Sequence, residues 1–212
     1  MRKLVHTVSW LVILTVFTLG CNRVLRISSS QTTDLSGRWN DEDARLVVAA
    51  MIKNMIPSPW LEKFMCINGN RLPVIMIGPM LNETDEHINL GQVAESIGYG
   101  LLNTATVRIV AHGIFREMLR KEKIDQQSFA SPETQKRLGH ELGADLVMCG
   151  TMNKIEDRNN RDKVVYYQFN SKLVNLETNE VVWAASKEIK KYLGGKRIKK
   201  KYRGKENKSA RK

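Results

Sequence analysis

Hydrophobic positions along the middle of the chain recur in two patterns, one with the period of a helix and one typical of strands. The helical pattern covers residues 41–55, 59–67, 89–103, 114–127 and 132–142. Continuous or alternating apolar runs, typical of strands, cover residues 73–78, 106–110, 145–151, 164–176 and 181–189. The order of these segments predicts an α/β fold in which helices cover a small mixed sheet.

Capping and turn residues lie between several of these segments. Asn40 or Asp41 can cap the first helix. Ser58 and Pro59 provide a cap and a first helical residue for the second helix. Residues 176–180 predict the hairpin turn between the last two strands.

An apolar, uncharged stretch at residues 11–21 follows Arg2 and Lys3 and ends in Cys21. A basic start, an apolar run and a small residue before a cleavage point are typical of a secretory signal peptide. Cysteine directly after that small residue resembles the lipobox of bacterial lipoproteins, although Thr18 stands where the lipobox usually has leucine. In that family the cysteine is acylated and becomes the mature N-terminus. The run has roughly 15 residues, fewer than the ~20 of a spanning helix. A transmembrane anchor, or a cleaved signal with an unmodified cysteine, is the alternative.

These features divide the chain into four parts: a signal peptide (1–20), a short linker after the lipidated cysteine (21–33), a globular domain (34–193) and a basic disordered tail (194–212). The 212 residues carry a net charge of +12, which is unevenly distributed. Residues 190–212 hold twelve basic side chains and one acidic one, whereas residues 22–189 hold 20 and 21. The body is therefore nearly neutral and the end of the chain carries the charge.

A terminal run of basic residues that is poor in apolar ones is typical of a solvated arm. Export from the cytoplasm argues against nucleic acid as its partner. Anionic lipid head groups and the acidic cell-wall polymer are candidate partners for the tail. A tail without any specific partner is the alternative.

The chain has three cysteines, and acylation of Cys21 would leave Cys66 and Cys149. An oxidising compartment permits a disulfide between these two. Both lie in apolar stretches, where buried free thiols are common. No group of residues has the spacing of a metal site, and we expect neither a metal nor a cofactor.

The residues that could carry catalysis form no recognisable motif. Gly98 and Gly100 lie in a predicted helix, which they weaken, and lack the third glycine of a dinucleotide site. His112, at the end of a predicted strand, is the strongest histidine candidate, although a capping or exposed role is simpler. The other candidates also have simpler explanations. His6 belongs to the signal peptide, His140 to a predicted helix, and Ser28, Ser29 and Ser30 to the linker, while Asp41, Glu42 and Asp43 are charges at a helix N-terminus. Asp85, Glu86 and His87 lie in a loop that is expected to be solvated and could alternatively bind a partner.

Three tryptophans remain after the signal peptide and are expected to anchor the fold. Trp183 lies in the middle of a predicted strand and should be in the core. Trp39 precedes the first helix and is expected to pack against the domain, with a surface position as the alternative. Trp60 belongs to the apolar face of the second helix.

Short motifs throughout residues 33–193 resemble the LpoB-like penicillin-binding protein activators. They are 34–46 (Asp-Leu-Ser-Gly-Arg-Trp-Asn-Asp-Glu-Asp-Ala-Arg-Leu), 59–62 (Pro-Trp-Leu-Glu), 125–127 (Asp-Gln-Gln), 131–139 (Ser-Pro-Glu-Thr-Gln-Lys-Arg-Leu-Gly), 141–145 (Glu-Leu-Gly-Ala-Asp), 150–151 (Gly-Thr) and 176–183 (Leu-Glu-Thr-Asn-Glu-Val-Val-Trp). The resemblance implies an outer-membrane lipoprotein that faces the periplasm, with a fold similar to the N-terminal domain of TolB. It also implies a protein that is not an enzyme, and that binds and stimulates a class A penicillin-binding protein.

Two features depart from the family pattern. The studied activators carry a long, proline-rich linker after the lipidated cysteine, whereas about a dozen residues separate Cys21 from Asp34 here. The basic tail is the second departure. A lipoprotein of another envelope assembly or secretion system with a TolB-like binding domain is therefore the alternative function. Asn22 stands where aspartate can retain lipoproteins in the inner membrane of some bacteria, so the outer membrane is favoured.

Overall fold

The structure is a computed structural model, and it describes residues 25–28, 31–111, 113–129, 131, 133, 142–160 and 162–194. The chain divides into two units, residues 1–33 and residues 34–212. Only residues 25–28 and 31–33 of the first unit are described. The signal peptide and Cys21 therefore lie outside the described residues, as do most of the predicted helix over 132–142 and the chain beyond residue 194.

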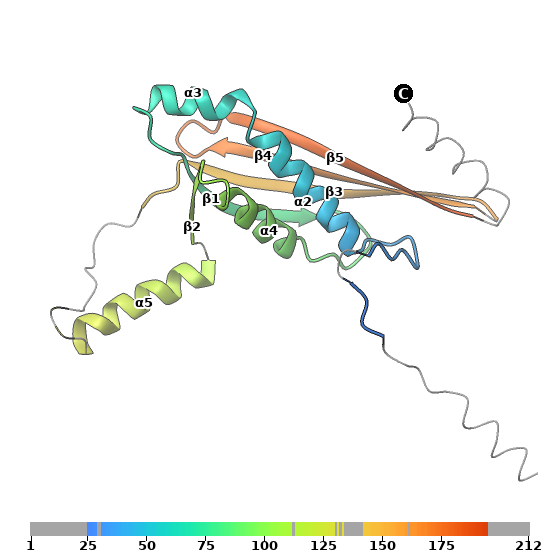
Figure 1. Cartoon of the computed structure of the whole chain (residues 1–212), viewed down its shortest axis with the longest axis horizontal. Coiled ribbons are helices and arrows are strands. Elements are labelled where there is room, and N and C mark those ends of the chain that lie inside the picture. Colours follow the sequence, from blue (N-terminus) through green and yellow to red (C-terminus); the bar gives the residue numbers. More distant parts are fainter. Residues whose placement is uncertain are drawn as a thin grey trace, which may run out of the picture. The chain divides into compact units, whose positions relative to one another are not determined.

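The second unit contains a five-stranded mixed sheet (Figure 1), as the hydrophobic pattern predicts. Its strands lie in the order β2-β1-β3-β4-β5. β1 pairs in parallel with β2 and β3, while β3, β4 and β5 form an antiparallel meander. The strands are β1 (Val74–Asn82), β2 (Arg108–Val110), β3 (Leu146–Arg158), β4 (Lys163–Asn175) and β5 (Val181–Leu193).

Helices α2 (Asp41–Met55) and α4 (Leu90–Leu102) pack against one face of this sheet. Both helices are amphipathic and direct large apolar side chains, such as Met51 and Ile97, at the strands. Alternate residues of the strands, such as Met148 and Phe169, point back at them and are fully buried. On the opposite face of β3, β4 and β5, which α2 and α4 do not cover, the side chains are half-buried or exposed.

The long strands continue beyond the predicted apolar runs. The predicted strand ends at residue 151 and the next one begins at residue 164, whereas β3 runs to Arg158 and β4 begins at Lys163. In this extension the side chains that interact across the strands are charged and not apolar. Lys163 on β4, for example, forms an ion pair with Glu156 on β3. β1 also passes its predicted end at Gly78, through an irregularity in register that accommodates Pro79.

The start of α3 (Pro59–Ile67) differs in detail from the predicted cap. Ser58 occupies the N-cap position, but its side chain makes no capping bond and its hydroxyl donates to the carbonyl of Asn54 instead. The buried Trp60 indole donates to the carbonyl of Met55 at 2.8 Å, and so ties α3 to the end of α2. By contrast, Asn40 caps α2 as predicted, in a reciprocal capping box with Asp43.

Gly98 and Gly100 allow α4 to approach its neighbours closely. A methyl group on Gly98 would lie 3.2 Å from the side chain of Ile77 on β1, and one on Gly100 would collide with Ile52 on α2. The sequence predicts only their weakening effect on the helix. Their packing role explains why that cost is tolerated.

We expect Gly100→Ala to lower the free energy of unfolding, despite the higher helix propensity of alanine. The new methyl group must displace Ile52 or shift α2, and overpacking of this kind costs about 1–3 kcal/mol. Chemical denaturation measures the change. Gly143→Ala, outside the helices, is the control, because no described residue lies within 4 Å of the added methyl group. A Gly100→Ala variant as stable as this control would contradict the packing role.

Helix α5 (Gly113–Phe129) is amphipathic and charged, as predicted, but none of its residues is buried. Its exposed apolar side chains include Ile114, Phe115, Met118 and Leu119. Among the described residues, no helix is long and apolar enough to cross a membrane.

Candidate functional site

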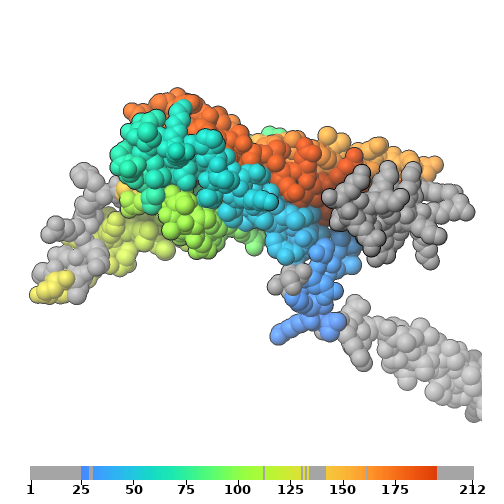
Figure 2. All heavy atoms as spheres, turned by 45° about the horizontal axis from the view of Figure 1, so that its top comes forward, coloured from blue at the N-terminus to red at the C-terminus, as the bar shows by residue number. Residues whose placement is uncertain are grey.

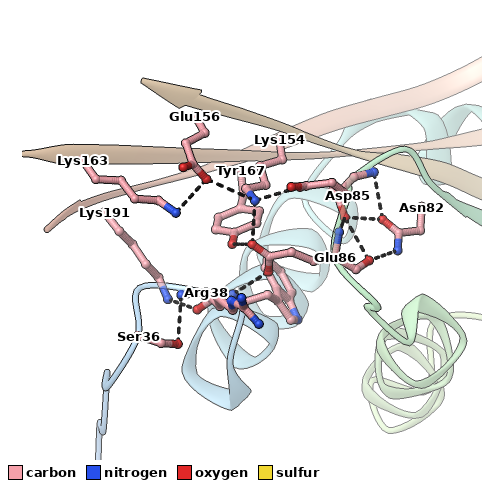
Figure 3. A network of polar contacts seen from close by, with 12 residues as sticks. Ser36, Arg38, Asn82, Asp85, Glu86, Lys154, Glu156, Lys163, Tyr167 and Lys191 are labelled. Carbon is pink, nitrogen blue, oxygen red and sulfur yellow. Dashed lines mark hydrogen bonds and ion pairs between the residues drawn. The ribbon is translucent and has the colours of Figure 1, made fainter. Parts of the chain in front are cut away.

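A network of charged side chains lies between the middle of the sheet and the loop that follows β1 (Figure 3). Its centre is Lys154 of β3, whose side chain is only 6% exposed. The Lys154 ammonium lies 2.7 Å from the carboxylate of Asp85 and 2.8 Å from that of Glu86. Glu156 lies 3.5 Å away on the other side and also binds Lys163. The buried cation is therefore compensated by a cluster of acidic groups.

Glu86 joins this cluster to the segment that leads into the domain. One of its carboxylate oxygens accepts a hydrogen bond of 2.7 Å from the hydroxyl of Tyr167, and the other accepts from the backbone N–H of Trp39 at 3.2 Å. The rings of Trp39 and Tyr167 meet edge to face, with centroids 5.6 Å apart. Trp39 thus packs against the domain, as expected.

The same leading segment, residues 34–40, which we call the strap, is also held by Lys191 near the end of β5. The Lys191 ammonium donates to the carbonyl of Arg38 at 2.9 Å and forms ion pairs with Asp34 at 3.3 Å and Asp43 at 2.5 Å. Gly37, which has a positive φ of 69°, lies directly against the side chain of Leu193. The strap and the end of β5 are therefore in direct contact.

The ionisation states of the network suit a structural role. Burial raises the pKa of the Tyr167 hydroxyl, and its hydrogen bond to Glu86 raises it further. Burial alone would lower the pKa of Lys154, but the hydrogen bonds and charges of Asp85 and Glu86 raise it overall. Burial would raise the pKa of Glu86, but its hydrogen bonds outweigh this and lower it. Lysine and tyrosine keep their protons and Glu86 stays ionised, so none of the three is poised for acid–base or nucleophilic chemistry near neutral pH.

We expect acid to destabilise the domain. Hydrogen bonds hold the pKa values of Glu86, in the network, and of Asp145, beside Arg71, below their usual range. These two carboxylates stabilise the fold fully at pH values above the unfolded pKa of about 4. Their contribution is lost as the pH falls through the lower pKa of the folded state. Asp43 acts in the opposite sense, because burial raises its pKa. Unfolding free energies measured from neutral pH to below pH ~4 should fall in the wild type and fall less in Glu86→Gln. Equal slopes for the two would contradict this assignment.

A hollow of about 620 Å³ lies between α3, the start of β3 and the β4–β5 turn. Arg71 forms two hydrogen bonds of 2.6 and 2.7 Å with Asp145 in its wall and lies 5.1 Å from the centroid of the Phe64 ring. The rim carries exposed apolar side chains, with Ile67 72% and Val181 50% exposed. Figure 2 shows α3 in teal beside the orange end of the meander. This end of the domain, which we call the α3 end, offers both apolar and paired polar groups to a partner.

A second hollow, of about 640 Å³, lies on the face of the sheet opposite α2 and α4. Small residues line it, including Cys149, Thr151, Ala184 and Ser186. Together with the exposed Leu81, they form a shallow apolar surface across β1, β3, β4 and β5. The sequence pattern does not reveal either hollow, because each is assembled from segments that are distant in the chain.

The structure separates the candidates suggested by the sequence. Asp85 and Glu86 belong to the network and are not simply a solvated loop, whereas His87 is exposed. Asp43 completes the capping box of α2 and pairs with Lys191, while Gly98 and Gly100 are packing residues. His6, Cys21, Ser29, Ser30, His112 and His140 lie outside the described residues.

The two remaining cysteines are both free. Cys66 is exposed on α3, which differs from the apolar surroundings that its sequence context predicts, and Cys149 is half-buried on β3.

Trp183 is in the core, as predicted. In the part of the chain that the structure describes, no group of three or more His, Cys, Asp or Glu residues could hold a metal ion.

A family model, that of the peptidoglycan-synthase activator LpoB, matches residues 43–189. The chain belongs to the LpoB family. The match spans nearly all of the sheet, helices α2 to α5 and the Glu86–Lys154–Tyr167 contacts, while the whole strap and the basic C-terminal segment lie outside it. The LpoB family is one of activators and not of enzymes.

Solved structures similar to the chain include the C-terminal domain of LpoB from Salmonella enterica, with 18% identity and a TM-score of 0.31. The similar region covers 62% of this chain and 93% of the Salmonella domain. The C-terminal domain of LpoB from Escherichia coli has 16% identity, the same coverages and a TM-score of 0.31. Lipoprotein GNA1162 from Neisseria meningitidis has 17% identity and a TM-score of 0.37, with coverages of 66% and 99%. No curated protein matches the chain in sequence.

Proposed function

We propose that this LpoB-family chain is a non-enzymatic lipoprotein, acylated at Cys21, that binds a class A penicillin-binding protein and stimulates its synthesis of peptidoglycan. The family match over residues 43–189 carries this proposal, because it covers nearly all of the folded domain. Activation without catalysis requires only a higher affinity for the active conformation of the synthase. The ionisation states of the buried network agree with a domain that binds and does not react.

The proposed location is the periplasmic side of the outer membrane, with the lipid on Cys21 as the anchor. Two sequence features support it: the lipobox-like end of the apolar stretch, and Asn22 directly after the cysteine. We further propose that the α3 end contacts the synthase, since Ile67 and Val181 expose apolar surface beside a hollow there.

The decisive experiment measures glycan polymerisation by the cognate class A synthase with and without the Cys21→Ser protein, which lacks the lipid. We expect a several-fold higher rate with the protein present. Ile67→Asp should weaken binding about tenfold, as for a central contact residue. Leu81→Asp, at the other hollow, is the matched control and should bind normally. An unchanged polymerisation rate at saturating wild-type protein would overturn the proposed function.

One observation favours a second candidate, a lipoprotein of another envelope assembly. The twelve residues between Cys21 and Asp34 reach about 40 Å when fully extended and about 20 Å as a flexible coil. An anchor in the outer membrane then allows little approach to a synthase in the inner membrane. Affinity purification from envelope extracts separates the two functions, because recovery of secretion components without any synthase would favour the second.

A further inference from the structure

The face of the sheet opposite α2 and α4, which we call the open face, carries a row of apolar side chains across four strands. The members of this apolar row, paired in register from β2 to β4, are Val110, Met76, Val147 and Val174. Each of them points away from α2 and α4, because its neighbour along the strand belongs to the core that these helices cover. All four are half-buried, and no described helix packs extensively against them.

Helix α5 exposes an apolar stripe of similar extent. Its members, which are 49–80% exposed, are Ile114, Phe115, Met118 and Leu119. Their spacing places them on one side of the first two turns, whereas Ile124 lies on the opposite side of the helix. An amphipathic helix in water depends on the packing of such a stripe for most of its stability. The stripe of α5 therefore requires an apolar surface to pack on.

The order of the strands determines the face on which α5 belongs. β1 pairs in parallel with β2 on one side and with β3 on the other. α4 connects β1 to β2 and packs on the same face as α2, whereas α5 belongs to the connection that returns from β2 across β1 to β3. Crossovers between parallel strands of one sheet are right-handed in about 98% of cases. Two right-handed crossovers in opposite directions lie on opposite faces, so α5 belongs on the open face.

The chain also holds the start of α5 close to the apolar row. Only two residues separate Val110, a member of the row, from Gly113, the first residue of the helix. The Arg116 side chain donates to the carbonyl of Leu142 at 3.4 Å, so the first turn lies near the residues that lead into β3. Gly113 has a positive φ of 55°, which suits a glycine at a hinge. Because the tether is short, contact with the chain's own sheet is favoured over contact with a second copy.

We propose that α5 is a lid, which packs its stripe on the apolar row of its own sheet, and that the structure shows this lid in its open position. Closing removes both apolar surfaces from water at once. It also covers Cys149, which lies on the same strand and face as Val147 and lines the hollow there. Closing leaves the α3 end uncovered, so the lid goes beyond the proposed contact with a synthase and does not depend on it.

The reactivity of the two native thiols tests the closed position in the Cys21→Ser protein. We expect maleimide to modify the exposed Cys66 quickly and Cys149 more slowly. Met118→Asp should open the lid and raise the rate at Cys149 about tenfold, with no change at Cys66. Ile124→Asp, on the other side of α5, is the matched control and should leave both rates unchanged. Equal rates at Cys149 in these two variants would overturn the closed position.

A cross-link identifies the sheet that receives the helix. Met118→Cys is combined with the native Cys149 in a protein that carries Cys21→Ser and Cys66→Ser, and is treated with a short bismaleimide. We expect a cross-link within one chain, whereas Ile124→Cys in the same background should form little. Cross-linked dimers would overturn the lid in favour of a second copy, and absence of any cross-link would overturn the docking itself. Because no synthase is present, the result is independent of the activation assay.

Discussion

Glu86→Ala should lower the free energy of unfolding by about 3–5 kcal/mol, the range found when one partner of a buried ion pair is removed. Glu86 is the common acceptor for the Lys154 ammonium, the Tyr167 hydroxyl and the Trp39 backbone N–H. Its removal leaves three donors without this partner, and leaves the buried lysine with the more exposed Asp85 and Glu156. Denaturant titration at neutral pH measures the loss.

A double-mutant cycle identifies the source of this loss. Lys154→Met removes the buried charge and keeps an unbranched side chain that is only one atom shorter. The double variant Glu86→Ala with Lys154→Met should be markedly more stable than the sum of the two single changes predicts, because no uncompensated cation remains. Glu83→Ala, in the same loop, is the control and should have little effect. Strict additivity of the two changes would show that the ion pair does not carry the stability.

The hydrophobic pattern predicts the order and type of the elements because helices and strands bury apolar residues with different periods. It loses β3 after residue 151, where the inward positions change from Met148 and Met152 to Lys154. The alternation of inward and outward side chains continues along β3, but the next inward residue, Lys154, is charged. Ion pairs with Asp85 and Glu86, which are distant in the sequence, allow Lys154 to be buried. A single sequence does not show which segments will supply such partners.

The polar network has one recognisable signal in the sequence. A lysine at an inward position of a strand must find a counter-charge, and the acidic loop with Asp85 and Glu86 is a natural source. The distance between Lys154 and this loop is fixed by the parallel pairing of β1 with β3, which brings Asn82 beside Met152. The strap could not be predicted in the same way, because residues 34–40 precede the first periodic element and contact the end of β5 only through tertiary packing.

Cys21→Ser should change the mode of membrane association of the full-length protein. With the lipid, membrane fractions should retain the protein in high salt. Without it, no acyl chain holds the protein, so high salt should release nearly all of it once residues 1–20 have been cleaved off. Fractionation of cells after a salt wash, together with incorporation of labelled palmitate, measures both attachment and acylation.

Absence of labelled palmitate from the wild-type protein would contradict the lipid anchor. Retention of this unlabelled wild-type protein after a high-salt wash would favour instead the uncleaved apolar stretch at residues 11–21 as the attachment.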